Sequence, residues 1–185
     1  MTRTGLLGWL LMAGLILGGC PGGLTGSGNP ADATNPGSTS GTTTAGEFVD
    51  CRVPAEEVAW AAEVLQHVND ERTSRGLTAL EPDSGLAEQA AAHACAMIHY
   101  GFFDHTNPVT GSTPLDRFEA SGFRGYTCGE NIAAGELTPA QVVTEWMNSP
   151  GHQANILAAD FTHVGIGIRQ GGPYRIYWVQ LFGGQ

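Results

Sequence analysis

The chain has 185 residues, enough for one ordinary domain with additional segments. It carries 18 acidic residues against eight basic ones, all of them arginine, for a net charge of −10. An acidic surface without an arginine cluster repels phosphate backbones, so no nucleic-acid partner is expected. The excess of acidic residues is better explained by solubility of the protein than by binding of a specific cationic ligand.

Residues 1–19 have the pattern of an export signal. Arg3 supplies a positive start, and the apolar run over residues 5–17 is too short to cross a bilayer of about 30 Å. The run ends in Leu17-Gly18-Gly19-Cys20, which resembles the lipobox of bacterial lipoproteins. That resemblance implies cleavage before Cys20 and a membrane anchor through acyl chains on its thiol. The alternative is an ordinary secretory signal with a cysteine near its cleavage site.

Residues 20–46 then comprise the lipidated cysteine and a linker. Apart from Asp32 and Leu24, the linker consists of Gly, Ser, Thr, Asn, Pro and Ala, and Leu24 is its only sizeable apolar residue. A segment of this composition cannot bury a core, so it predicts a disordered tether. The folded domain is expected over residues 47–185.

Helix signals dominate the first part of the domain, and strands come late. Apolar spacing, caps and glycine stops predict helices over residues 54–75, 83–100 and 114–120, a further helix opening at 138–141, and a helical turn after Ser149-Pro150. The alanine run at residues 90–92 predicts close packing of its helix on a sheet. Strands are predicted over residues 165–170 and 175–182, with a turn between them. This order predicts an α+β fold.

Five short motifs in order resemble the bacterial, SCP-like form of the CAP superfamily, the group of cysteine-rich secretory proteins, antigen 5 and pathogenesis-related proteins. They are Phe103–Thr106, Gly129–Ala133, Trp146–Leu157, Val164–Gly167 and Tyr177–Gly183. The resemblance covers roughly residues 55–183 and implies a single-domain α-β-α sandwich.

The same resemblance implies a central cavity with two histidines and two glutamates. His105 and His152 match the histidines, and Glu130 matches the first glutamate. The position of the second glutamate holds Ser149. Glu145 lies one helical turn away and is a weaker candidate for the same place.

The cavity residues allow two interpretations. Two imidazoles and a carboxylate suit Zn²⁺ with an open position for water, so His105 and His152 are candidate ligands and Glu130 a candidate ligand or base. The alternative is a buried hydrogen-bond network that holds three loops together without any ligand. The sequence contains neither His-Glu-x-x-His nor Gly-x-Ser-x-Gly.

Three cysteines remain after Cys20, in a secreted context that permits disulfides. Cys95 is expected on a helix and Cys128 in a loop, and the CAP fold implied by the resemblance brings these regions near one another. This favours Cys95–Cys128, with a bridge to Cys51 as the alternative and one thiol left over.

Several further polar residues are given structural roles. Asn69 and Arg72 are expected to tie the first helix to neighbouring loops. His163 is expected to be half-exposed at the start of a strand. The remaining histidines lie on predicted helices and are expected at the surface or at caps: His67, His93 and His99.

These observations favour an envelope-anchored, extracytoplasmic CAP-domain lipoprotein of a bacterium. The first hypothesis is a non-enzymatic binding or scaffold module for a lipid, envelope or protein partner, since CAP proteins are reported to bind sterols, lipids or proteins. The second is a metal-assisted hydrolase using the His/Glu cavity. The third is a structural envelope protein whose cleft is vestigial.

Overall fold

The computed structural model describes residues 11–15, 48–135 and 137–185. The predicted lipidation site Cys20 and the predicted linker lie outside the described residues. In the described part of the chain, no helix is both long and apolar enough to cross a membrane.

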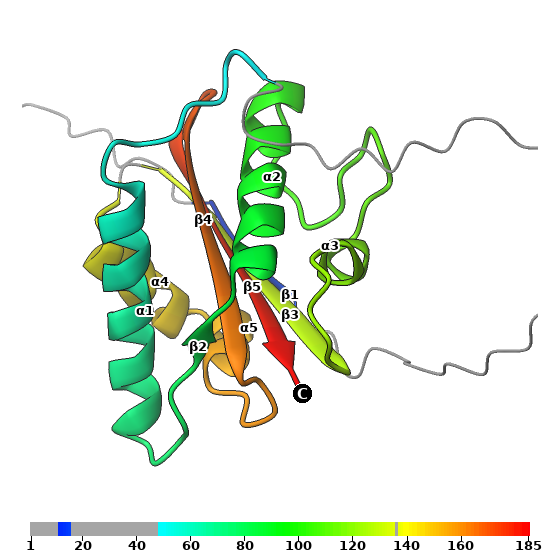
Figure 1. Ribbon diagram of the computed structural model, residues 1–185. Coiled ribbons are helices and arrows are strands. Elements are labelled where there is room, and N and C mark those ends of the chain that lie inside the picture. Colours follow the sequence, from blue (N-terminus) through cyan, green and yellow to red (C-terminus); the bar gives the residue numbers. More distant parts are fainter. Residues whose placement is uncertain (1–10, 16–47, 136) are drawn as a thin grey trace, which may run out of the picture.

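The fold is an α-β-α sandwich around one mixed sheet (Figure 1). The strand order is β1-β3-β5-β4-β2, with the strands at β1 Leu11–Leu15, β2 Glu81–Pro82, β3 Thr127–Ala134, β4 His163–Gly171 and β5 Arg175–Gly184. One face is covered by α2 (Ser84–Tyr100) and α3 (Pro114–Ala120). The other is covered by α1 (Glu57–Thr73), α4 (Pro139–Asn148) and α5 (Pro150–Ile156). The α+β prediction and the implied sandwich are confirmed.

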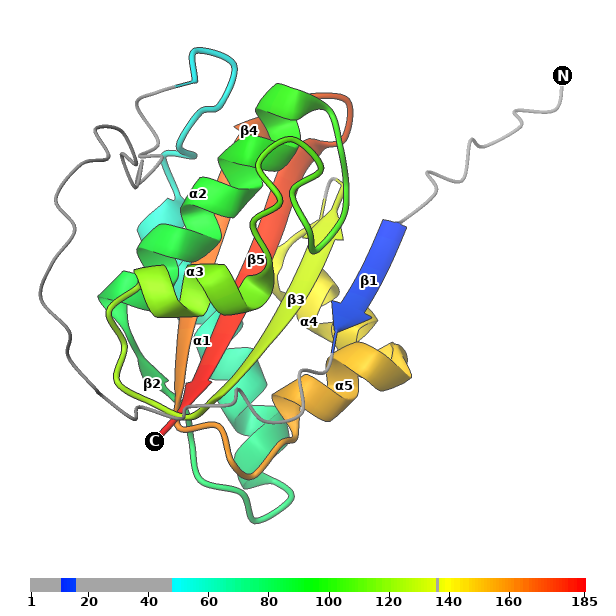
Figure 2. The same ribbon diagram turned by 90° about the vertical axis from the view of Figure 1, so that its right-hand side faces the viewer.

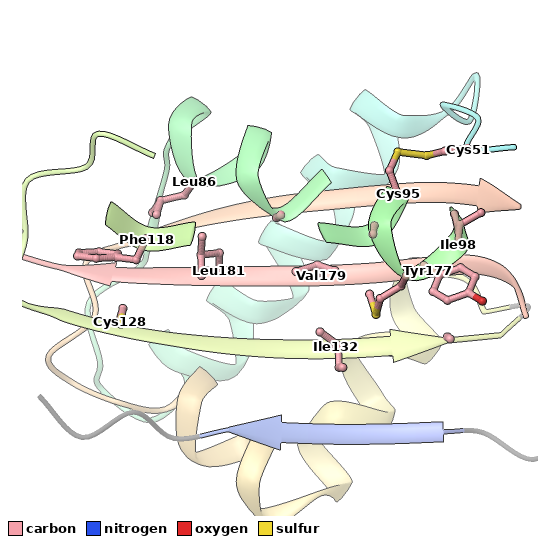
Figure 3. Close-up of a cluster of buried hydrophobic side chains, with 14 residues drawn as sticks. Cys51, Leu86, Cys95, Ile98, Phe118, Cys128, Ile132, Tyr177, Val179 and Leu181 are labelled. Carbon is pink, nitrogen blue, oxygen red and sulfur yellow. A yellow bond between two sulfur atoms is a disulfide. The ribbon is translucent and has the colours of Figure 1, made fainter. Parts of the chain in front are cut away.

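Each face of the sheet has its own apolar core, because successive side chains of a strand point to opposite faces. On β5, Tyr177, Val179 and Leu181 pack toward α2 and α3. Trp178 and Phe182 pack toward α1, α4 and α5. Figure 3 shows the first of these cores.

Helix α2 lies unusually close to β4. A Cβ atom on Gly165 or Gly167 would fall inside the backbone of α2 at Ala87 and Ala91, respectively. Glycine on the strand and alanine on the helix therefore let the two backbones approach. The close packing predicted from the alanine run is confirmed.

Helix α1 is shorter than predicted, running over Glu57–Thr73. Its buried side chains are Val64, Val68 and Arg72, whereas Val58 is 84% exposed. Arg72 donates to the carbonyls of Thr78, Ile156, Ala158 and Phe161, and Asn69 pairs with the backbone of Leu80 in both directions. Both residues tie the helix to loops, as predicted.

The favoured disulfide prediction is wrong, and its alternative holds. Cys95 is bonded to Cys51 across a sequence separation of 44 residues (Figure 3). Cys128 lies in β3 rather than in a loop, and it pairs with Gly183 at the end of the sheet where β4 begins. That end adjoins the start of α2, whereas Cys95 lies in its second half. None of the cysteines in the described residues is a free thiol.

Candidate functional site

A cluster of buried polar side chains surrounds Glu130. Glu130 lies in the middle of β3 and is completely buried. Its side chain points into the layer of α2 and α3, the same face as Cys128 and Ile132. A carboxylate in such a position needs partners for both oxygens.

Arg117 supplies most of these partners. Its Nε donates to Oε2 of Glu130 and one terminal nitrogen donates to Oε1, each at 2.8 Å. The side chain is 4% exposed. Helix α3 fixes it there, because Thr113 and Asp116 form a capping box and Pro114 occupies the first turn. The pair is a buried, two-pronged ion pair.

His105 completes the coordination of the carboxylate. Its Nδ1 lies 2.8 Å from Oε1 of Glu130, and its carbonyl accepts from Arg117 at 2.6 Å. An ionised carboxylate only accepts, so Nδ1 carries the proton in this pair. The other ring nitrogen, Nε2, is buried and has no hydrogen-bond partner among the described residues.

His93 is also part of the cluster, contrary to the prediction that it lies at the surface or at a cap. It is 3% exposed on α2, and its Nε2 lies 3.9 Å from Oε1 of Glu130. The same nitrogen donates to the carbonyl of Asp104 at 3.0 Å. Burial lowers the pKa of His93 to about 4, with Arg117 and His105 acting in the same direction and Glu130 opposing them. The imidazole is therefore neutral at pH 7.

The charges of the cluster keep Glu130 ionised. Burial alone raises the pKa of a carboxyl, but Arg117 and then His93 and His105 outweigh it and hold the pKa of Glu130 below its usual value. One anion thus faces one permanent cation, and the histidines add polar contacts.

His152 lies on the other face of the sheet. It is fully buried on α5, and its carbonyl accepts from the side chain of Asn131, the neighbour of Glu130 on β3. Asn155 joins this network by donating to Asn131 and to the Glu130 carbonyl. His105 and His152 therefore approach β3 from opposite faces.

The two weaker candidates lie at the junction of α4 and α5. Glu145 is half-buried near the end of α4. Ser149 occupies the N-cap position of α5, but only its carbonyl bonds there, to the Gln153 amide, and its side chain makes no cap hydrogen bond.

A divalent metal does not fit the residues around Glu130. Both carboxylate oxygens are engaged by Arg117 and His105, and the guanidinium places a permanent positive charge where a cation would bind. In the described residues, no group of three His, Cys, Asp or Glu side chains is arranged to hold a metal ion. The geometry corresponds to a hydrogen-bond network in which both oxygens of Glu130 are paired within the protein.

Sequence signals for the two unexpected members do exist. Arg117 occurs one and three positions from the buried Phe118 and Pro114, on the apolar face of α3. His93 lies between Ala90, Ala94 and Met97 on the inward face of α2. A polar residue on the apolar face of a helix is expected to be buried, and a buried polar group needs a hydrogen-bond partner.

A concave feature lies at the β2 edge of the sheet, away from the Glu130 cluster. It is an apolar groove between α1 and α2 over β4, with a volume of about 230 Å³. Its lining residues are Ala61, Ala62, Leu65, Pro82, Asp83, Ala87, Val164 and Ile166. Asp83 caps α2 by accepting from the Leu86 amide, so its carboxylate is already engaged.

The sandwich is the fold of a CAP-type, or SCP-type, domain. The family model "CAP: Cysteine-rich secretory protein family" matches residues 65–182. The chain belongs to this family.

Relatives and solved structures agree with this assignment. The chain is 40% identical over 132 residues to YkwD of Bacillus subtilis, covering 71% of this chain and 50% of YkwD. It is 34% identical over 120 residues to the B. subtilis membrane protein YlbC, covering 65% of this chain and 33% of YlbC. The chain thus spans half or less of the length of these relatives.

Two solved structures share the fold. An extracellular protein containing a SCP domain from Bacillus anthracis superposes with a TM-score of 0.62 at 26% identity, over 72% of this chain and 45% of that one. An outer surface protein from Borrelia burgdorferi gives 0.62 at 23% identity, over 72% of this chain and 96% of that one. The second likeness concerns the fold alone.

Proposed function

We propose that this protein is an extracytoplasmic binding module of the cell envelope, without catalytic activity, that takes a slender apolar ligand such as a lipid acyl chain. The observation that carries the proposal is the apolar groove between α1 and α2. Its volume of about 230 Å³ lies below the roughly 300–1,000 Å³ of ordinary small-molecule pockets. A narrow apolar groove suits one chain better than a bulky ring system.

The state of Glu130 supports a non-catalytic role. A general base or metal ligand needs a free lone pair, and Arg117 and His105 occupy the carboxylate of Glu130. The cluster therefore serves to join α3, the loop at His105 and β3.

An envelope location rests on the leader and on the relatives. The predicted export signal and Cys20 favour a domain outside the cytoplasm that is anchored to a membrane by lipid. The B. anthracis protein with a SCP domain is described as extracellular, which supports the same side of the membrane. The ligand would then come from the envelope itself.

A titration with cis-parinaric acid tests the groove, because this fatty acid becomes fluorescent in an apolar site. We expect saturable binding to the full chain and a loss of at least tenfold in affinity for Ala62→Trp, which fills the groove from α1. Val58→Trp is the matched control, since Val58 is on the same helix and 84% exposed. Absent or unsaturable binding, or equal effects of both variants, would refute the proposal.

The metal-assisted hydrolase has one observation in its favour, the buried Nε2 of His105 without a partner in the described part of the chain. Calorimetric titration with zinc, alongside His105→Ala and His152→Ala, distinguishes the two functions. We expect no tight one-to-one binding. Tight binding that both variants lose would favour the hydrolase, and absence of both zinc and fatty-acid binding would favour the structural protein.

A further inference from the structure

The outer edge of β3 is a second surface of interest, independent of the apolar groove. One edge of β3 pairs with β5 along its whole length, from Thr127 opposite Gly184 to Ala134 opposite Tyr177. The other edge pairs antiparallel with β1, from Leu15 opposite Glu130 to Leu11 opposite Ala134. Strand β1 is thus the edge strand of the sheet, beside β3 in Figure 2.

The segment that covers this edge belongs to the predicted leader. Residues 11–15 lie inside the apolar run that the sequence predicts to be removed before Cys20. In the described residues, no strand other than β1 pairs with this edge. Cleavage would therefore leave the backbone N–H and C=O groups at this edge of residues 130–134 without a strand partner.

The edge lacks the features that protect exposed strands from pairing. Residues 127–134 contain no proline and no lysine, and their register with β5 is continuous, without a bulge. Their one charge, on Glu130, is directed into the buried cluster and paired with Arg117. An incoming strand would meet neither a charge nor a kink.

Helix α5 packs beside the same edge. It contacts both β3 and β1, so one face of the sheet is covered where the edge strand lies. The sequence of the present occupant, Leu-Met-Ala-Gly-Leu, is uncharged and mostly apolar. The edge thus accepts an extended apolar segment, with main-chain hydrogen bonds as its specific contacts.

We propose that this edge is a docking site for an extended, uncharged apolar peptide, which adds antiparallel to residues 130–134 as a new strand. Leu11–Leu15 occupies the site while the leader is attached, and a peptide of a partner protein takes its place afterwards. The partner segment needs about five residues in extended conformation, as in β1.

A labelled peptide tests the site on the full chain. The probe has the sequence of residues 10–16 with two arginines at each end for solubility, and its binding is followed by fluorescence polarisation. Ala13→Pro with Gly14→Pro removes two β1 amides and should release the edge. Ala13→Gly with Gly14→Ala keeps both amides and is the matched control.

We expect the double-proline chain, and the chain from Cys20 to Gln185, to bind the probe at least tenfold more tightly than the full chain and the control. Two N-methylated probes, blocked at alternate residues, then test for strand pairing. Only one of them should lose binding, because the amides of an antiparallel strand alternate between the neighbouring strand and the open side. Equal binding by the double-proline chain and the full chain, or equal loss with both methylated probes, would overturn the proposal.

Discussion

Arg117 places its Nε and a terminal nitrogen on the two oxygens of Glu130, each at 2.8 Å, in a fully buried site. The pair joins α3 to the middle of β3, and His105 and His93 close around it. The ion pair between Arg117 and Glu130 therefore has a structural role, because it holds α3 on the sheet. Its disruption should therefore appear first in stability.

Replacing Arg117 with Met is expected to lower the free energy of unfolding by about 3–5 kcal/mol, because it leaves the carboxylate of Glu130 buried without its cation. Urea unfolding, followed by circular dichroism, measures the change. Combining Arg117→Met with Glu130→Gln should cost at least about 1 kcal/mol less than the sum of the two single variants, since the residues act as one unit.

The exposed pair Arg75–Glu71 on α1 is the matched control for this experiment, with side chains 45% and 38% exposed. Arg75→Met should change stability by at most about 1 kcal/mol. A similarly small effect of Arg117→Met would contradict the structural role of the buried pair.

His93 should make the protein sensitive to mild acid. Burial lowers its pKa from 6.5 to about 4, so the unfolded chain takes up this proton more readily than the folded chain. Stability is then complete above about pH 6.5 and falls as the pH drops toward about 4, by on the order of 3 kcal/mol in all. Denaturant unfolding at a series of pH values measures this slope.

The variant His93→Gln should flatten the slope between pH 6.5 and 4, whereas His67→Gln, at a half-exposed position on α1, should leave it unchanged. The contribution of Glu130 falls in a lower range. Its pKa is lowered in the fold, so its stabilisation persists down to about pH 4.5 and is lost below that value. An unchanged slope in His93→Gln would show that other groups cause the acid sensitivity.

The helices and the last two strands could be predicted from the sequence because caps, glycine stops and apolar spacing act locally. Strand β3 could not. Its residues are buried on both faces, with Glu130 and Asn131 in the middle of the run, so it lacks the alternation of a half-buried strand. These polar residues can be buried there only because side chains and carbonyls from the helices on both faces of the sheet form hydrogen bonds with them.

The candidate site could be predicted only in part. The resemblance named Glu130 and His105, which the fold brings together. It also named His152, which the fold places across the sheet on α5. Helical spacing places Arg117 and His93 on the buried faces of α3 and α2. Their partner Glu130 comes from a distant part of the chain, and spacing does not encode that contact.

The Cys51–Cys95 bridge should contribute strongly to stability. It closes a loop of 44 residues and attaches the segment before α1 to α2. Loop-closure entropy gives about 4 kcal/mol for a loop of this length. Cys51→Ala should therefore lower the unfolding free energy by about 2–5 kcal/mol, and peptide mapping without reduction should recover Cys51 joined to Cys95. Recovery of Cys95 joined to Cys128 would contradict the observed pairing.

The contact between α2 and β4 should tolerate no added side chain. In Gly167→Ala, the new methyl group would overlap the backbone of Ala91, which cannot move without displacing the helix. We expect a loss of about 1–3 kcal/mol or more in thermal or urea unfolding. Ile166→Val, the neighbour on the opposite face, removes one methylene and should cost only about 0.5–1.5 kcal/mol. A neutral Gly167→Ala variant would mean that α2 can shift away from the sheet, and it would weaken the assignment of the alanine and glycine residues as a matched packing surface.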